Sequence, residues 1–408
     1  MKRTFIVILL ICVCVPIIAQ NKNAIPYDND VDSNQKSTIS LAIPTQMFFK
    51  NNEYTRKIAY GYTLGGFRTI PQVEYKLNSS LSISVGINLL RYWGANKYGN
   101  YNFVNVPYYS DTNSQSQFHW KSYLRIAWQV NNRLKFVAGN IETQHYHYLP
   151  IPLYNRELSY TSDGEEGLQL LYNGKYWTND AWVNWQNFNF YNDIDRESFE
   201  LGISGYVNTS QKSKIVGLLN YAFIWHHNGG ELDTISTLDL DHWSNGRIGG
   251  ELKINDIFNK NLDLAFAFDY LFAKDMKNST WAFKSGYAYF PTIKLNGNNW
   301  QTTLGYYDSK KMMTFYGTNF FSNLAQRQSN VVYPHNQMLY ASIDYCLNMN
   351  GSSNKFLSNY YMTLVGEFFY KLDTENSIEK ESNTLSFGLG VVLTAKPKFK
   401  LYKFKNLN

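Results

Sequence analysis

A period-two alternation of apolar and polar residues recurs along this chain from about residue 37 to residue 396 and constrains its fold more than any other feature. In the segment 81–89, Leu81, Val85 and Leu89 belong to an apolar set, and Ser82 and Asn88 belong to a polar set. Successive side chains of a β-strand point to opposite faces. The alternation therefore predicts an all-β protein whose strands have one apolar and one polar face.

The alternating segments predict about sixteen strands, with fourteen or eighteen as alternatives. The expected ranges are 37–49, 58–77, 81–93, 117–130, 133–144, 165–176, 179–190, 197–209, 212–226, 244–256, 260–275, 279–295, 299–308, 336–349, 356–372 and 382–396. Every second connection is short, as at 78–80, 131–132 and 296–298. The others are mostly longer, as at 94–116, 145–164 and 309–335. This pattern predicts a transmembrane antiparallel up-and-down β-barrel with short periplasmic turns and long extracellular loops.

Aromatic residues lie at strand ends on the apolar face, as a membrane barrel requires at the lipid–water boundary. Trp93, Trp225, Tyr270 and Tyr370 end strands of this kind, and Trp300 begins one. After the first twenty residues no run is apolar enough to form a spanning helix. The formal net charge of +6 comes from scattered residues, so we expect no nucleic-acid partner.

The two ends of the chain differ from the repeating middle. Lys2 and Arg3, an apolar run at 5–18 and the small Ala19 predict a signal peptide over residues 1–19. A polar leader is expected at 20–36, the barrel at 37–396 and a basic periplasmic tail at 397–408. Cys346 is the one cysteine left after cleavage, so no internal disulfide is expected.

Several short motifs carry a family resemblance. They are Asn-Asn-Glu-Tyr at 51–54, Gly-Tyr-Thr-Leu at 61–64, Asn-X-Glu at 140–142, Pro-Leu-Tyr at 152–154 and Asp-Ala-Trp-Val-Asn-Trp at 180–185. With them the chain resembles porin-like outer-membrane β-barrels of Gram-negative bacteria, including a poorly characterised group of secreted barrels. The resemblance implies a location in the cell outer membrane, with its lipid and lipopolysaccharide and the barrel-assembly machinery as partners. The resemblance leaves open whether the protein forms a homo-oligomer.

A barrel of about sixteen strands encloses an interior too wide for side chains alone to fill. The polar faces are expected to line it with Arg125, Arg133, Lys135, Arg247, Lys253 and Lys284, and with Glu200, Glu251, Asp263, Asp269, Asp344 and Glu367. Because the two signs balance, we expect weak charge selection. An equally open interpretation is that these residues only satisfy one another and water.

The connection at 145–164 is apolar and contains prolines, unlike the polar stretch at 111–117. We expect it to fold into the lumen as a constriction loop that includes His145, His147, Tyr148, Tyr154, Arg156 and Glu157.

Signals for chemistry are sparse. His145 and His147 would share a face of a strand, and His226 and His227 are adjacent, but neither pair has an obvious partner ligand. We expect no metal, no cofactor and no enzymatic activity, because no Ser–His pair with diagnostic spacing is evident. The predicted function is passive diffusion of small hydrophilic solutes through a porin-like channel. The alternatives are a surface barrel that binds glycan or capsule without an open pore, a barrel enzyme acting on lipid or glycan, and a soluble secreted β-protein.

Overall fold

The computed structural model describes residues 36–404, apart from 56–57, 60, 94–117, 144–145, 189–195, 210–212, 231–239, 260, 278–281, 326–331, 349–359, 373, 376–379 and 382. The predicted signal peptide and nearly all of the leader lie outside the described residues.

The described chain is almost entirely β-structure. Its strands are β1 (Thr38–Ala42), β2 (Thr45–Glu53), β3 (Tyr62–Thr69), β4 (Gln72–Lys76), β5 (Leu81–Trp93), β6 (Phe118–Gln129), β7 (Leu134–Asn140), β8 (Glu166–Asn173), β9 (Trp177–Asn187), β10 (Ser198–Asn208), β11 (Ile215–Asn228), β12 (Asp241–Ile254), β13 (Asp263–Asp275), β14 (Ser285–Asn296), β15 (Trp300–Lys310), β16 (His335–Asn348), β17 (Tyr360–Lys371), β18 (Thr374–Glu375), β19 (Lys380–Glu381), β20 (Thr384–Ala395) and β21 (Lys398–Lys403). The helical segments are the short α2 (Leu158–Thr161) and the 3-10 turns η2 (Tyr146–Tyr148), η3 (Ile257–Asn259) and η4 (Asn319–Phe321).

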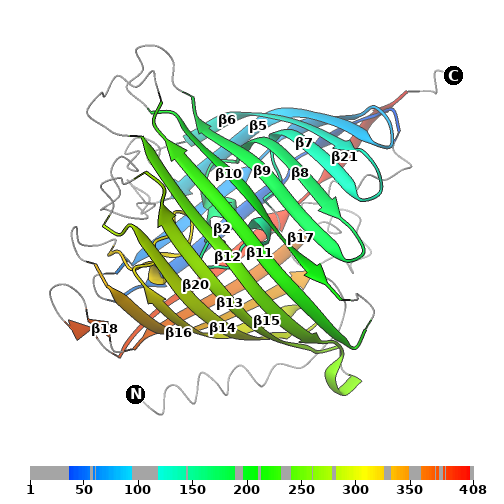
Figure 1. Cartoon of the computed structure of the whole chain (residues 1–408). Helices are drawn as coiled ribbons and strands as arrows, with labels where there is room; N and C mark the ends of the chain where they lie inside the picture. Colours follow the sequence, from blue (N-terminus) through cyan, green and yellow to red (C-terminus); the bar gives the residue numbers. More distant parts are fainter. Residues whose placement is uncertain are drawn as a thin grey trace.

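The sheet closes on itself. Each strand pairs antiparallel with its neighbours along the chain, and β20 pairs with both β17 and β2. Nineteen segments form the sheet, and three of them, β1, β4 and β21, continue β2, β3 and β20, so the ring has sixteen strands. The strands run obliquely around the barrel (Figure 1). The predicted fold class is confirmed. The strand ends lie within a few residues of those expected, except that β3 begins at Tyr62, β7 ends at Asn140 and β14 begins at Ser285.

Three prolines, Pro44, Pro71 and Pro397, interrupt neighbouring strands at one level of the barrel. The amide of Ile43 donates to the carbonyl of Pro397 (3.0 Å), and Ile70 donates to Pro44 (2.9 Å) in the same way. Because proline has no amide hydrogen to donate, each one breaks its ladder for a residue, and the alternation resumes beyond it. The sheet therefore continues as β1, β4 and β21.

This continuation corrects the expected C-terminal boundary. Residues from 397 on were expected to form a basic tail, but Lys398–Lys403 form β21 and pair with β1. Phe399 and Leu401 are exposed in it, at 45% and 56%. The basic composition concealed a strand because Pro397 separates it from β20.

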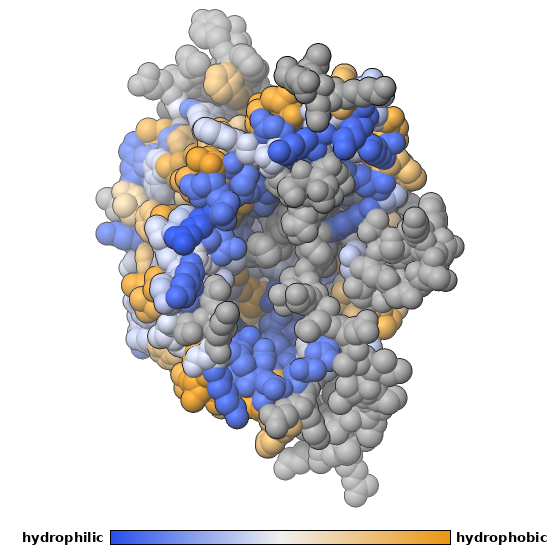
Figure 2. Space-filling model, turned by 90° about the vertical axis from the view of Figure 1, so that its right-hand side faces the viewer, coloured by the Kyte–Doolittle hydropathy of each residue, from blue (hydrophilic) through white to orange (hydrophobic). Residues whose placement is uncertain are grey.

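The two faces of the sheet differ as a membrane barrel requires. In β6, Leu124, Ile126 and Trp128 are exposed, whereas Arg125 and Ala127 are buried on the inner side. Apolar outer faces of this kind recur around the ring, and they match the lipid-facing band of an outer-membrane barrel. Hydrophilic residues surround the recessed centre of the barrel end seen in Figure 2, and hydrophobic residues lie at its periphery. Among the described residues, no helix has the length and apolarity to cross a membrane.

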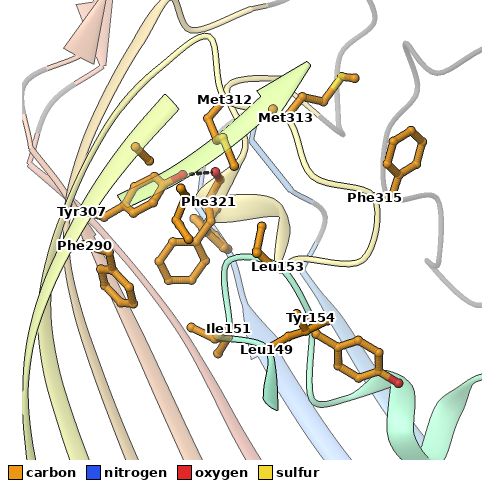
Figure 3. Packing of buried hydrophobic residues seen from close by; sticks show 14 of the residues in the cluster. Leu149, Ile151, Leu153, Tyr154, Phe290, Tyr307, Met312, Met313, Phe315 and Phe321 are labelled. Atoms are coloured by element: carbon orange, nitrogen blue, oxygen red, sulfur yellow. Dashed lines mark hydrogen bonds between the residues drawn. The ribbon is translucent and has the colours of Figure 1, made fainter. Parts of the chain in front are cut away.

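The main apolar core lies inside the barrel. Two connections fold inward in their described parts: 141–165 between β7 and β8, without 144–145, and 311–334 between β15 and β16, without 326–331. Leu153 and Phe321 are almost fully buried in one cluster, and Tyr154 forms a parallel bridge with Tyr316. Figure 3 shows Phe321 against Phe290 and Tyr307 of the wall, with the Tyr307 hydroxyl donating to the Phe321 carbonyl (2.6 Å).

Candidate functional site

The inward connection 141–165, here called the crossing loop, is held at one end by a buried histidine. His147 has a left-handed backbone (φ 50°), and its ring stacks on Trp182 at 4.0 Å between centroids. Its Nδ1 lies 2.8 Å from Asp180 Oδ2, and its Nε2 lies 3.0 Å from Glu165 Oε2. Burial disfavours the imidazolium, but Glu165 and Asp180 outweigh this effect and hold the pKa of His147 well above its ordinary value.

Neighbouring side chains fix these carboxylates. The Tyr154 hydroxyl donates to Glu165 (3.0 Å), and the Gln169 amide donates to both oxygens of Asp180 (3.0 Å each). The indole of Trp182 donates to Glu200 at 2.7 Å. The imidazole therefore lies in a hydrogen-bonded network that joins the loop to β8, β9 and β10.

The middle of the crossing loop, at Arg156 and Glu157, is held by ion pairs to a different part of the wall. Lys50 of β2 lies 2.8 Å from Glu157 and 2.9 Å from Glu367 of β17. Arg156 contacts Asp344 of β16 at 2.6 Å, and the Tyr62 hydroxyl donates to Glu157 at 2.7 Å. In the Glu157 and Arg156 contacts a loop residue binds an inward-facing residue of the wall, whereas the Lys50–Glu367 pair joins two strands of the wall.

The two anchor points lie on nearly opposite sides of the ring. Asp180 lies on β9, and Asp344, which pairs with Arg156 of the loop, lies on β16. Six strands, β10 to β15, separate β9 from β16 in a ring of sixteen. The loop therefore crosses the lumen from the Asp180 side to the Asp344 side.

Most of the predicted lumen charges lie in ion pairs. Arg125 and Lys135 both contact Glu142, Arg247 contacts Asp269 (2.6 Å), Lys253 contacts Asp263 (2.8 Å) and Glu251 contacts Lys294 (2.7 Å). Burial raises the pKa of Glu142, but the two cations outweigh this effect and lower it. The lumen charges thus compensate one another locally.

Some predicted site residues lie elsewhere. Arg133 is exposed in the turn between β6 and β7 and does not lie on a strand. Lys284 lies just before β14, where it pairs with Asp275 at 3.1 Å. Tyr148 is in the crossing loop, where its carbonyl is 3.4 Å from Arg247, and His145 falls outside the described residues.

Sequence reasoning missed the second inward connection, 311–334. Met312, Met313, Phe320, Phe321 and Leu324 are buried in it, and the Asn245 amide donates to the Met313 carbonyl (2.7 Å). Its signal was the low polarity already used for 145–164. In the part of the chain that the structure describes, no group of three or more His, Cys, Asp and Glu is arranged to hold a metal ion.

Comparison with known proteins identifies the family. The family described as Lipid A 3'-O-deacylase-type matches residues 31–404. The chain belongs to this family. The expectation of no enzymatic activity is therefore wrong, because this family is named for an enzyme. No curated protein sequence matches.

A solved structure supports the fold. OccAB2 of Acinetobacter baumannii superposes with a TM-score of 0.53 at 10% identity, over 90% of this chain and 100% of that one. OprD of Pseudomonas aeruginosa gives a TM-score of 0.47 at 6% identity, over 94% and 98%. At such identities the likeness concerns architecture alone. The porin-like barrel and its apolar belt place the protein in the outer membrane.

Proposed function

We propose that the protein lets small hydrophilic solutes cross the outer membrane passively through a lumen narrowed by the crossing loop. The observation that carries this proposal is the attachment of that loop to nearly opposite sides of the ring, at Asp180 and at Asp344. A loop fixed in this way narrows the water-filled passage of a wide barrel permanently, and it does not open and close as a gate.

Selection should depend on size more than on charge. The inward charges form ion pairs such as Arg247–Asp269, so little net charge faces a passing solute. Rings of one sign produce ion selectivity, and compensated pairs do not. We propose that lipopolysaccharide surrounds the barrel and that the barrel-assembly machinery inserts it into the membrane. Both proposals are supported by the apolar outer face, which is bordered by aromatic residues as in other outer-membrane barrels.

Planar-bilayer recording of the purified protein tests the channel. Deleting Tyr148–Tyr154 should raise single-channel conductance, because it removes the buried middle of the crossing loop. A heat-modifiability gel verifies that the shortened barrel folds. An unchanged conductance would reject the constriction. No conductance at all, together with polysaccharide binding, would favour a surface barrel that binds glycan.

A second candidate function is hydrolysis of an acyl ester of lipid A in the outer membrane. The family match over residues 31–404 favours it. Mass spectrometry of lipid A incubated with the purified protein tests it directly. Loss of one acyl chain supports the activity, and unchanged lipid A excludes it.

A further inference from the structure

A polar cluster lies on the lipid-facing side of β15 and β16, away from the lumen. His335 Nε2 lies 2.7 Å from Asp308 Oδ1. The other oxygen, Asp308 Oδ2, accepts hydrogen bonds from the Gln337 amide (3.2 Å) and the Tyr306 hydroxyl (3.4 Å). The histidine and aspartate side chains remain accessible, at 40% and 30%.

Strand alternation places this cluster on the outer face. Leu304 and Leu339 share the face with Asp308 and His335, and both are exposed at 48% and 44%. Ser309 and Asn336, one residue along each strand, are buried on the inner side. Cross-strand register then brings together residues that are 27 positions apart in sequence.

The setting of Asp308 is unusual for a membrane-facing carboxylate. On the outward faces of β10 to β17, all within the described chain, it is the one Asp or Glu. Its cross-strand neighbour on β14 is Tyr289, whose ring lies 5.6 Å from that of Tyr287 between centroids. Aromatic rings of this kind mark the membrane–water boundary, and an ionisable group facing lipid there suggests a functional site.

We propose that Asp308 and His335 form a hydrolytic site for an acyl ester of a membrane glycolipid that enters from the lipid side. This inference rests on the second candidate function, lipid A hydrolysis. The Nε2–H of His335 donates to Asp308, which fixes the ring and leaves the Nδ1 lone pair as the base. Gln337 and Tyr306 act as positioning residues through the carboxylate.

The reaction needs water as its one co-reactant. His335 Nδ1 takes a proton from a water molecule as the water oxygen attacks the ester carbonyl carbon. The tetrahedral intermediate then collapses, and the bond from the carbonyl carbon to the sugar oxygen breaks. The imidazolium returns the proton to that oxygen, giving a free fatty acid and a sugar hydroxyl. Lys310, directly opposite His335 in the ladder, places a cation beside the anionic headgroup.

The test uses full-length protein in detergent with purified lipid A, read by mass spectrometry. His335→Gln and Asp308→Asn should each slow loss of the acyl chain by about 100-fold or more, the range for removing a general base. His227→Gln is the matched control, because His227 also faces outward among aromatic rings, 4.6 Å from Phe199.

The possible outcomes distinguish failure of the hydrolase function from failure of the proposed site. An inactive wild type refutes the hydrolase function and this site together. An active wild type with an equally active His335→Gln variant overturns the site and leaves the hydrolase function standing. Heat-modifiability gels show that each variant is folded.

Discussion

Replacing His147 by alanine tests the anchor of the crossing loop most directly. The substitution removes the cation between Asp180 and Glu165 and the ring that stacks on Trp182. Asp180 and Glu165 are 3% and 14% exposed, so both carboxylates would stay largely buried without their partner. The strands of the barrel keep their ladders, so the cost should fall on docking of the loop.

The magnitude follows from that burial. Removing one partner of a buried ion pair costs about 3–5 kcal/mol, because the remaining charge stays desolvated. A loss of this size raises the undocked population of the loop by roughly 150-fold to 4,000-fold. The remaining contacts of Glu157 and Arg156 should then be insufficient to keep the loop across the lumen at all times.

Two assays report the position of the loop. Trypsin should cut after Arg156 much faster in the variant, since that residue is paired with Asp344 inside the lumen when the loop is docked. Single-channel recordings should show larger and noisier currents. His227→Ala on the outer face is the control and should leave both measurements unchanged. Adding Glu165→Gln and Asp180→Asn should partly restore docking, because it removes the unpaired charges. Wild-type trypsin resistance and conductance in His147→Ala would refute the reasoning.

Three further outcomes are expected. Because the pKa of His147 is raised, its stabilising charge is fully present below about pH 6.5 and is lost as the pH rises through the raised pKa. Trypsin cleavage after Arg156 should therefore increase at alkaline pH in the wild type, and a pH-independent rate would contradict the assignment. Phe321→Ala empties a fully buried position and should cost about 3–5 kcal/mol, measured by urea unfolding, against the exposed Phe258→Ala as control. Leu304→Arg puts a charge on the lipid-facing side and should destabilise the barrel by about 2–4 kcal/mol in lipid vesicles, whereas no change would place β15 outside the membrane.

The two inward-folded connections show how much of the structure composition alone can predict. The apolar, proline-containing stretch at 145–164 predicted an inward loop, and Leu149, Ile151 and Leu153 are buried. The same criterion applied to 311–334 would have found Met312 and Phe321. Composition did not indicate that the first loop would cross from β9 to β16, because that depends on the position of each strand in the closed ring.

Period-two alternation is a local property, since each residue's face follows from that of its neighbour. The sequence alone therefore determined an all-β barrel of about sixteen strands, the lipid-facing side and the inward position of residues such as Arg247 and Asp269. The ring closure in the structure decided between sixteen strands and the alternatives of fourteen or eighteen. Partners across strands depend on register, ring closure and loop docking, which combine contributions from the whole chain. Only the tertiary structure could therefore decide that His147 meets Asp180, that Lys50 meets Glu157, and that His335 meets Asp308.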